Sequence, residues 1–168
     1  MACVPRSIHP TVTTTATLST AARLLPITDP RMTRFWITLQ QGVNFVLTSM
    51  ELMRGGEIFV PKIPSMSVLD LASSLAPGLP HRVIGIRPGE KLHEIMVPEE
   101  MAHHTVEFDD HFVIAPAIKF FNRSNDFSSN ALQEQGKLVA PGFEYVSDTN
   151  PDFLTVEQMR QFNQEAMS

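Results

Sequence analysis

The chain has 168 residues, a length typical of one domain, and its 43% hydrophobic and 18% charged residues are enough to build a folded core. Thirteen basic residues stand against 18 acidic ones, and the formal net charge of −5 argues against nucleic-acid binding as the main function. The single cysteine, Cys3, excludes an intrachain disulfide and a cysteine-rich zinc site. No apolar run approaches the roughly 18 residues of a membrane span. We therefore expect a cytoplasmic protein with neither a membrane nor a nucleic acid as its partner.

The first 24 residues differ in composition from the rest of the chain. Residues 1–28 contain no Asp or Glu, and residues 11–20 are mostly Thr, Ala and Ser. The stretch has no apolar segment of the kind found in secretory signals, and it lacks the amphipathic pattern of a stable helix. We expect residues 1–24 to be a poorly ordered leader and residues 25–168 to form the folded domain.

A helix is the first element that the sequence predicts. Apolar residues recur at three- and four-residue steps over 36–53, and Gly55 and Gly56 after Arg54 are suited to end the helix. The stripe consists of Trp36, Leu39, Val43, Val46, Met50 and Met53. One small sheet cannot cover so long a stripe, so we expect part of it to be exposed.

A strand, a second helix and another strand come next. The strand is expected over 57–60, where prolines stop it. Ser67 is a suitable N-cap for the following helix, with Asp70 three residues later, and the turn residues at 77–80 end that helix. The next strand is expected over 81–86.

The region after this strand is expected to be a turn followed by short elements. Arg87-Pro88-Gly89 predicts the turn, and Leu92, Ile95 and Met96 predict a short helix. Residues 105–116 are typical of two short strands that are broken around Asp109-Asp110.

The last part of the chain combines a loop and a helix. Residues 120–136 are rich in Asn, Ser and Gln and predict a long polar loop. Thr155 and Gln158 form a capping pair for a final helix. Because helices and strands alternate in the middle of the chain, the fold class is α/β or α+β.

The sequence contains no recognisable set of catalytic residues. It has neither a GxGxxG loop after a strand nor a GxxxxGK[ST] loop, and no GxSxG motif. The only tyrosine, Tyr145, is followed four residues later by Thr149 and not by Lys, so a Tyr-x-x-x-Lys pair is missing. His93-Glu94 is not followed by the second histidine of an HExxH zinc site. We therefore assign no catalytic residue.

Two basic segments are candidates for anion binding. Arg34 stands beside aromatic residues at the start of the first predicted helix, and Arg87 stands at a strand-to-helix turn, where a helix N-terminus would add to its charge. Glu90, three residues after Arg87, is placed to accept hydrogen bonds from sugar hydroxyls. The alternatives are a solvated Arg34 or an Arg34 paired with Asp29, and ordinary surface charge for Arg87.

Four histidines lie in one short span beside several carboxylates. A metal site is conceivable there, but the adjacent His103 and His104 would point in different directions on a helix. We favour solvated or hydrogen-bonded histidines and predict no metal site. The span contains His93, His103, His104, His111, Glu99, Glu100, Asp109 and Asp110.

Five stretches of the chain form one distinctive set: LPITDPRMTRFWITLQQGVNFVL, GGEIFVPKIPSMSVLDLA, IGIRPGEKLHEIMVPEE, VEFDDHFVIAP and YVSDTNPDFLT. They resemble the C-terminal half of bacterial inverting UDP-N-acetylglucosamine 4,6-dehydratases, a family of extended short-chain dehydrogenase/reductases that makes pseudaminic acid and surface polysaccharides. The resemblance covers about residues 25–168. The resemblance implies an α/β fold that corresponds to the C-terminal substrate-binding portion of such an enzyme, with the Rossmann half absent.

The resemblance also implies a division of roles. The Rossmann half of the complete enzyme holds NADP and the acid/base residues. We therefore expect this chain alone to bind no NADP. The C-terminal half binds the UDP-sugar, here UDP-N-acetylglucosamine, with Arg34 and Arg87 on the diphosphate and Glu90 on the uridine ribose. Thr33 and Lys91 are expected as their neighbours.

Three functions follow from this resemblance. The chain is the substrate-binding part of a dehydratase that needs a Rossmann half from elsewhere, an inert UDP-sugar-binding remnant, or an interaction module without enzymatic function. We favour the first, with the isolated chain inactive. The expected partners are the missing Rossmann half or further copies of this chain.

Overall fold

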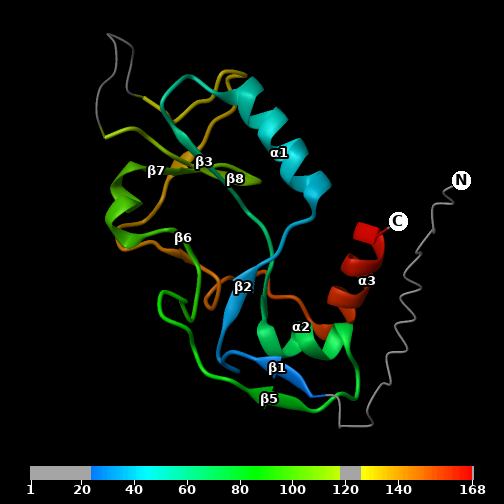
Figure 1. The fold of residues 1–168 in the computed structure, drawn as a ribbon. Helices are drawn as coiled ribbons and strands as arrows, with labels where there is room; N and C mark the ends of the chain where they lie inside the picture. The colour runs from blue at the N-terminus through cyan, green and yellow to red at the C-terminus, as the bar shows by residue number, and fades with distance from the viewer. Residues whose placement is uncertain (1–23, 118–125, 168) are drawn as a thin grey trace, which may run out of the picture.

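The computed structural model describes residues 24–117 and 126–167, so residues 1–23 of the predicted leader lie outside this range. The fold combines short strands with three α-helices (Figure 1). In chain order the elements are β1 (Leu25–Ile27), β2 (Thr33–Phe35), α1 (Leu39–Leu52), β3 (Ile58–Pro61), β4 (Ser65–Ser67), α2 (Val68–Leu75), β5 (His81–Val83), β6 (Ile95–Val97), a 3₁₀ helix (Glu99–His104), β7 (Thr105–Glu107), β8 (His111–Ile114), β9 (Lys137–Leu138), β10 (Tyr145–Val146) and α3 (Val156–Met167).

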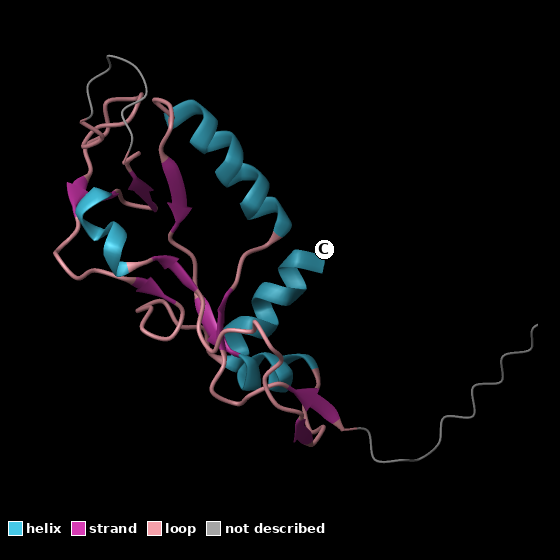
Figure 2. Cartoon of the chain, turned by 60° about the vertical axis from the view of Figure 1, so that its left-hand side comes forward, coloured by secondary structure: helices cyan, strands magenta, loops and turns pink. Residues whose placement is uncertain are grey.

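The largest sheet has the strand order β3-β8-β7-β9, and its neighbouring strands are antiparallel. Three further pairs have two strands each: β2 with β4 and β6 with β10 are antiparallel, and β1 with β5 is parallel. The four-stranded sheet and α1 lie at one end of the molecule, and α2 with the β1–β5 pair lies at the other (Figures 1 and 2). The mixed α/β class is confirmed.

Two parts of the core correspond to these two ends. Val60, Phe112 and Tyr145 belong to the cluster between the four-stranded sheet and the β6–β10 pair. Met66 and Met159 form a second cluster, in which α3 packs against α2 with the help of partly buried Trp36 and Leu71. Segments far apart in the sequence therefore form both ends.

The N-capping predictions for α2 and α3 are confirmed, whereas α1 ends at Leu52 with extended Met53 as its C-cap, before the predicted glycines. Ser67 Oγ accepts a hydrogen bond from the Asp70 backbone N–H at 3.0 Å and caps α2. Thr155 and Gln158 form the reciprocal pair that begins α3, with the Gln158 N–H donating to Thr155 Oγ1 at 3.3 Å. Each cap involves residues only three positions apart, so it can be predicted from the local sequence.

Helix α1 is shorter than predicted and carries an exposed apolar face. Thr38 caps it through a reciprocal pair with Gln41, so Trp36 precedes the helix and packs elsewhere. Leu52 is buried, whereas Val43, Val46 and Met50 expose 46%, 58% and 64% of their surface. The stripe that marks α1 in the sequence therefore faces outward.

The expected short helix over 92–96 is wrong. Strand β5 ends at Val83, the chain then runs through turns, and Ile95–Val97 forms β6 instead. Its residues pair with Tyr145 and Val146 of β10, far along the chain. This pairing satisfies the backbone of β-favouring residues and overrides the weak helical periodicity. The two strands predicted within 105–116 are confirmed as β7 and β8.

Candidate functional site

The two arginine-bearing segments meet beside β2. The Thr33 backbone N–H donates to the Leu92 carbonyl at 3.0 Å, so the end of the 84–94 segment lies along β2. The other side of β2 pairs with β4, with Arg34 opposite Met66. Strand β2 thus joins α2's end of the molecule to the segment that carries Arg87 and Lys91.

The Arg34 side chain is already engaged within the protein. Its Nη1 donates to the carbonyls of Thr33 and Leu92 at 2.6 and 3.1 Å, and its Nη2 donates to the Lys91 carbonyl at 3.0 Å. Its Nε lies 3.4 Å from Glu94 Oε1, and 28% of the side chain is exposed. Arg34 therefore holds the 91–94 segment in place, and the interpretation of Arg34 as the partner of Asp29 is wrong. Asp29 pairs with Arg31 at 2.8 Å.

Thr33 lies in a buried hydroxyl cluster that the sequence did not indicate. Its Oγ1 is 2.7 Å from Ser147 Oγ and 2.8 Å from His93 Nδ1. Ser147 is fully buried, and its Oγ also accepts the Glu94 backbone N–H at 2.9 Å. Because Ser147 is 114 residues from Thr33, no local sequence signal could have paired them.

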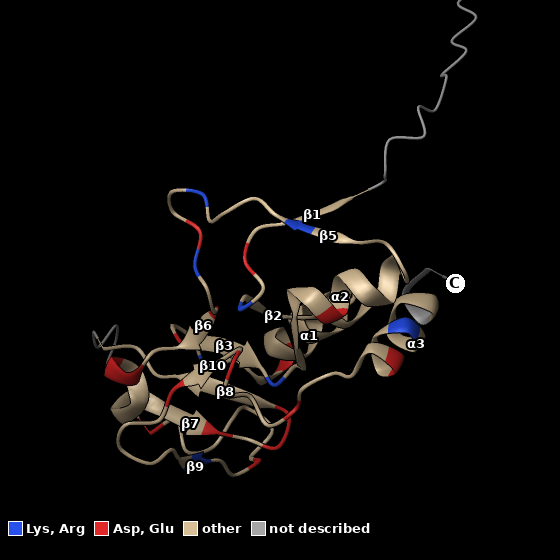
Figure 3. Cartoon of the chain, turned by 90° about the horizontal axis from the view of Figure 1, so that it is seen from below, with Lys and Arg blue, Asp and Glu red and all other residues tan. Residues whose placement is uncertain are grey.

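Arg87, Glu90 and Lys91 lie on an open loop. The Arg87 N–H donates to Glu90 Oε2 at 2.9 Å, and the Glu90 N–H donates to the Arg87 carbonyl at 3.1 Å, so the four residues close a turn. Gly89 within it has a φ of 87°, which favours glycine. Arg87 is exposed, and Figure 3 shows this charged loop projecting from the body beyond β5. The expected helix N-terminus behind Arg87 is absent from this described segment, so that part of the prediction is wrong.

The structure thus brings some predicted site residues together and separates others. Thr33, Arg34 and the Lys91 backbone are in direct contact. Within residues 24–117 and 126–167, no hydrogen bond or ion pair joins the Arg87 or Glu90 side chain to Arg34. Arg87 therefore remains available to a ligand, whereas Arg34 is fixed.

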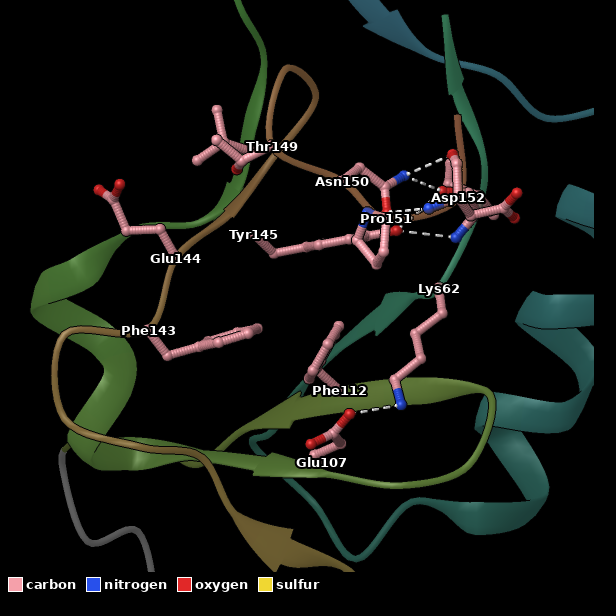
Figure 4. A pocket seen from close by; sticks show the side chains of 12 residues that line it. Lys62, Glu107, Phe112, Phe143, Glu144, Tyr145, Thr149, Asn150, Pro151 and Asp152 are labelled. Carbon is pink, nitrogen blue, oxygen red and sulfur yellow. Dashed lines mark hydrogen bonds and ion pairs between the residues drawn. The ribbon is translucent and has the colours of Figure 1, made fainter. Parts of the chain in front are cut away.

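A separate cavity of about 340 Å³ opens between the β6–β10 pair and the four-stranded sheet (Figure 4). Phe112, Phe143 and Tyr145 contribute aromatic rings to its wall, with ring centroids about 5.1 Å apart where Phe112 meets the other two. Lys62 points across it toward Glu107, and their charged atoms lie 2.8 Å apart.

The polar groups of this cavity serve the fold. Tyr145 Oη accepts the Ile63 N–H at 2.9 Å and donates to the Ile63 carbonyl at 2.8 Å, so the phenol is bound to the backbone both as acceptor and as donor. Burial raises the pKa of Tyr145 above its ordinary value, and the hydrogen bond from the Ile63 backbone offsets this in part. Lys62 also donates to the Phe108 carbonyl at 2.6 Å. We therefore place the candidate site at β2 and the 84–94 segment.

The histidines are dispersed. The rings of His103 and His104 lie at the end of the 3₁₀ helix, tilted by 44° with their centroids 4.1 Å apart, so the expectation that they point in different directions is wrong. Buried His111 pairs with Asp110 at 2.6 Å and stacks on Phe108. In the described part of the chain, no group of three or more His, Cys, Asp or Glu residues could hold a metal ion. None of the helices described is both long and apolar enough to span a membrane.

Comparison with known proteins places these features in a family. A family model described as polysaccharide biosynthesis protein matches residues 12–116. The match begins upstream of residue 25, so the similarity to the family extends into the predicted leader.

Two curated relatives come from Campylobacter jejuni, and both are named UDP-N-acetylglucosamine 4,6-dehydratase (inverting). They are 59% and 52% identical to this chain over 142 residues, which cover 84% of this chain and 42% of each relative. A UDP-glucose 4-epimerase of Rickettsia canadensis is 38% identical over 141 residues, covering 82% of this chain and 40% of the epimerase. The chain thus spans less than half the length of these relatives.

A solved structure agrees with the fold. The X-ray structure of Pen from Bacillus thuringiensis superposes with a TM-score of 0.67 and 26% sequence identity, covering 84% of this chain and 42% of Pen. The partial coverage fits a portion of an extended short-chain dehydrogenase/reductase, as the fold-class prediction stated. With the family model over residues 12–116 and the identity to the dehydratases, the chain belongs to the polysaccharide biosynthesis protein family.

Proposed function

We propose that this chain binds the UDP group of UDP-N-acetylglucosamine and is the substrate-binding part of a nucleotide-sugar 4,6-dehydratase that serves pseudaminic acid or surface polysaccharide synthesis in the cytoplasm. The 59% identity to the Campylobacter enzyme supports the substrate class. The observation that carries the proposal is the junction of β2 with the 84–94 segment, which brings two arginine-bearing segments side by side.

Arg87 is the main diphosphate ligand in this proposal. Its exposed guanidinium offers a fork of N–H donors that suits phosphate oxygens better than an ammonium does. Every nitrogen of the Arg34 guanidinium has a protein partner, so Arg34 contributes its positive charge and holds the segment. Glu90 contacts the ribose hydroxyls, with Thr33 and Lys91 beside the diphosphate.

Turnover requires more than this chain supplies. Oxidation at C4 of the sugar needs a hydride acceptor, and the sequence has neither a glycine-rich dinucleotide loop nor a Tyr-x-x-x-Lys pair. We propose that NADP is bound by a Rossmann half and that the isolated chain is inactive. An inert UDP-sugar-binding remnant is the second candidate, because it too would lack the dinucleotide loop and the Tyr-x-x-x-Lys pair.

The exposed face of α1 is the proposed contact for that Rossmann half. Val43, Val46 and Met50 form an exposed apolar row on α1, in which Leu52 is the buried residue. Such a face is costly to leave in water. Val46→Glu is expected to abolish association with a separately produced Rossmann half of a relative, measured by analytical ultracentrifugation. The matched control is Glu51→Gln, an exposed α1 residue outside that row. Unchanged association of Val46→Glu would exclude this contact.

Isothermal titration with UDP, CMP and inorganic pyrophosphate tests the binding function. We expect UDP to bind more tightly than pyrophosphate, because the ribose contributes, and CMP more weakly than UDP. Equal or undetectable binding of all three would favour the interaction module. Dehydratase turnover by the purified chain with added NADP would overturn the proposed inactivity.

A further inference from the structure

We propose that Ser147 is a positioning residue of the nucleotide site, which acts by fixing the 91–94 segment through a directed chain of hydrogen bonds to Thr33 and His93. The effect on binding rests on the proposed UDP function. The chain of hydrogen bonds itself rests only on the geometry of β2, β10 and the segment between β5 and β6.

Ser147 satisfies both backbone groups of Glu94. The Ser147 N–H donates to the Glu94 carbonyl at 2.9 Å, and Ser147 Oγ accepts the Glu94 N–H, also at 2.9 Å. Ser147 is fully buried, so water cannot replace these bonds. Glu94 is the residue whose carboxylate lies 3.4 Å from Arg34 Nε.

The direction of the remaining bonds follows from the donors available. Ser147 Oγ accepts from Glu94, which leaves its own proton for Thr33 Oγ1 at 2.7 Å. Thr33 Oγ1 then donates to His93 Nδ1 at 2.8 Å. An accepting Nδ1 requires a neutral ring with its proton on Nε2, and that nitrogen lies 3.8 Å from Asp148 Oδ2.

The opposite direction leaves one group without a partner. If His93 Nδ1 donated to Thr33, Thr33 would donate to Ser147, and the Ser147 proton would then have no acceptor among the hydrogen bonds of the described residues. A buried hydroxyl proton without an acceptor is destabilising. The geometry therefore favours the Nε2–H form of His93.

The hydrogen bonds of Ser147, Thr33 and His93 hold the 91–94 segment from one side, and Arg34 holds it from the other. Arg34 binds the carbonyls of Lys91 and Leu92, while Ser147 and Thr33 hold Glu94 and His93. Loss of the Ser147 hydroxyl frees the Glu94 N–H and releases one side of the segment. Arg87 lies on the loop that runs directly into this segment, so its position depends on the same anchor.

The experiment compares Ser147→Ala with Ser65→Ala in the intact chain. Ser65 is also fully buried, but its Oγ has no hydrogen-bond partner among the described residues, so Ser65→Ala repeats the packing change alone. We expect Ser147→Ala to weaken UDP binding about tenfold in calorimetry. This is the size of effect expected when one hydrogen bond that positions the 91–94 segment is lost. Ser65→Ala is expected to leave the affinity unchanged.

A spectroscopic signature separates positioning from general loss of stability. Nitrogen-15 NMR of the histidine rings is expected to show the Nε2–H form of His93 in the parent and in Ser65→Ala, and a mixture of forms in Ser147→Ala. An Nδ1–H form in the parent, or a Ser147→Ala variant with parental tautomer and affinity, would overturn the proposal.

Thr33 supplies a second pair of variants should Ser147→Ala fail to fold. Thr33→Val removes the middle hydroxyl and is expected to lose the tautomer preference, whereas Thr33→Ser keeps it. Equal spectra for these two variants would also overturn the proposal. If the parent does not bind UDP, the proposed function fails, while the NMR result still decides whether the hydrogen-bond chain exists.

Discussion

Arg34 and Arg87 are both expected to bind the diphosphate, yet the structure gives them opposite environments. Arg34 is held by three backbone carbonyls and Glu94 and exposes 28% of its side chain. Arg87 lies on an exposed loop, where only its backbone is bound by Glu90. The two arginines expected at the diphosphate therefore differ in role: Arg34 holds the 91–94 segment, and the guanidinium of Arg87 is exposed and open to a ligand.

Among the substitutions that test this difference between the two arginines, Arg34→Ala is expected to have the largest effect. The substitution removes the guanidinium donors of the Thr33, Lys91 and Leu92 carbonyls, of which Leu92 keeps the Thr33 N–H. Losing several charge-assisted hydrogen bonds costs about 2–4 kcal/mol of stability. UDP binding should be lost as well. Urea denaturation measures the first effect and calorimetry the second.

Arg31→Ala is the matched control for that experiment. Arg31 is exposed and its ion pair with Asp29 lies at the surface, so its loss should leave the unfolding midpoint nearly unchanged. An Arg34→Ala variant that is as stable as Arg31→Ala would show that Arg34 does not hold the segment.

Arg87→Ala is expected to affect binding alone. One charge-assisted contact contributes about 1.5–3 kcal/mol, so UDP affinity should fall roughly ten- to a hundredfold while the denaturation midpoint stays constant. Arg87→Lys should recover only part of the affinity, because an ammonium lacks the fork of donors. If Arg87→Ala binds UDP as tightly as the parent, Arg87 is ordinary surface charge.

Glu90→Gln should have a smaller effect that depends on the ligand. The amide oxygen can still accept the Arg87 N–H, so the turn is preserved. We expect a few-fold weaker binding of UDP, since the proposed ribose contact loses its charge, and no change for pyrophosphate. Calorimetry with both ligands measures the difference, and equal losses for the two would assign Glu90 to the turn only.

The smallest effect concerns pH and the turn before β2. Hydrogen bonds from Arg31 lower the pKa of Asp29 from 3.8 to about 2. A lowered pKa means that the contribution of Asp29 to stability is complete above pH 3.8 and is lost as the pH falls through about 2. Because Arg31 exposes 69% of its side chain, water screens the pair, and Asp29→Asn should shift the acid midpoint only slightly. A large shift in an acid titration followed by circular dichroism would show that this turn controls β2.

The sequence predicted the features that depend on neighbours. The caps at Ser67 and Thr155 need only residues three positions away, and both are present in the structure. The helix expected over 92–96 failed because Ile95 and Val97 pair with β10, a partner that periodicity cannot reveal. The position of Ser147 in the site was missed for the same reason.

The apolar stripe of α1 shows a different limit. Its spacing correctly predicted a helix, but spacing does not say whether a face meets the protein's own core or another surface. The sequence positions of Arg34, Arg87 and Glu90 made them candidates for anion and sugar binding, and the family resemblance implied the diphosphate and the ribose as their ligands. Their contrasting environments could not be predicted, because Arg34 binds carbonyls of the 91–94 segment, which is far from it in the sequence.

The placement of Tyr145 makes the protein its own optical reporter. It is the only tyrosine, as Trp36 is the only tryptophan. Tyr145 bonds to Ile63 beside the cavity, whereas Trp36 packs against the cluster of Met66, Leu154 and Met159 near α2 and α3. Phenolate absorbance during alkaline titration would therefore follow the opening of one end of the molecule, while indole emission follows the other, without any attached dye.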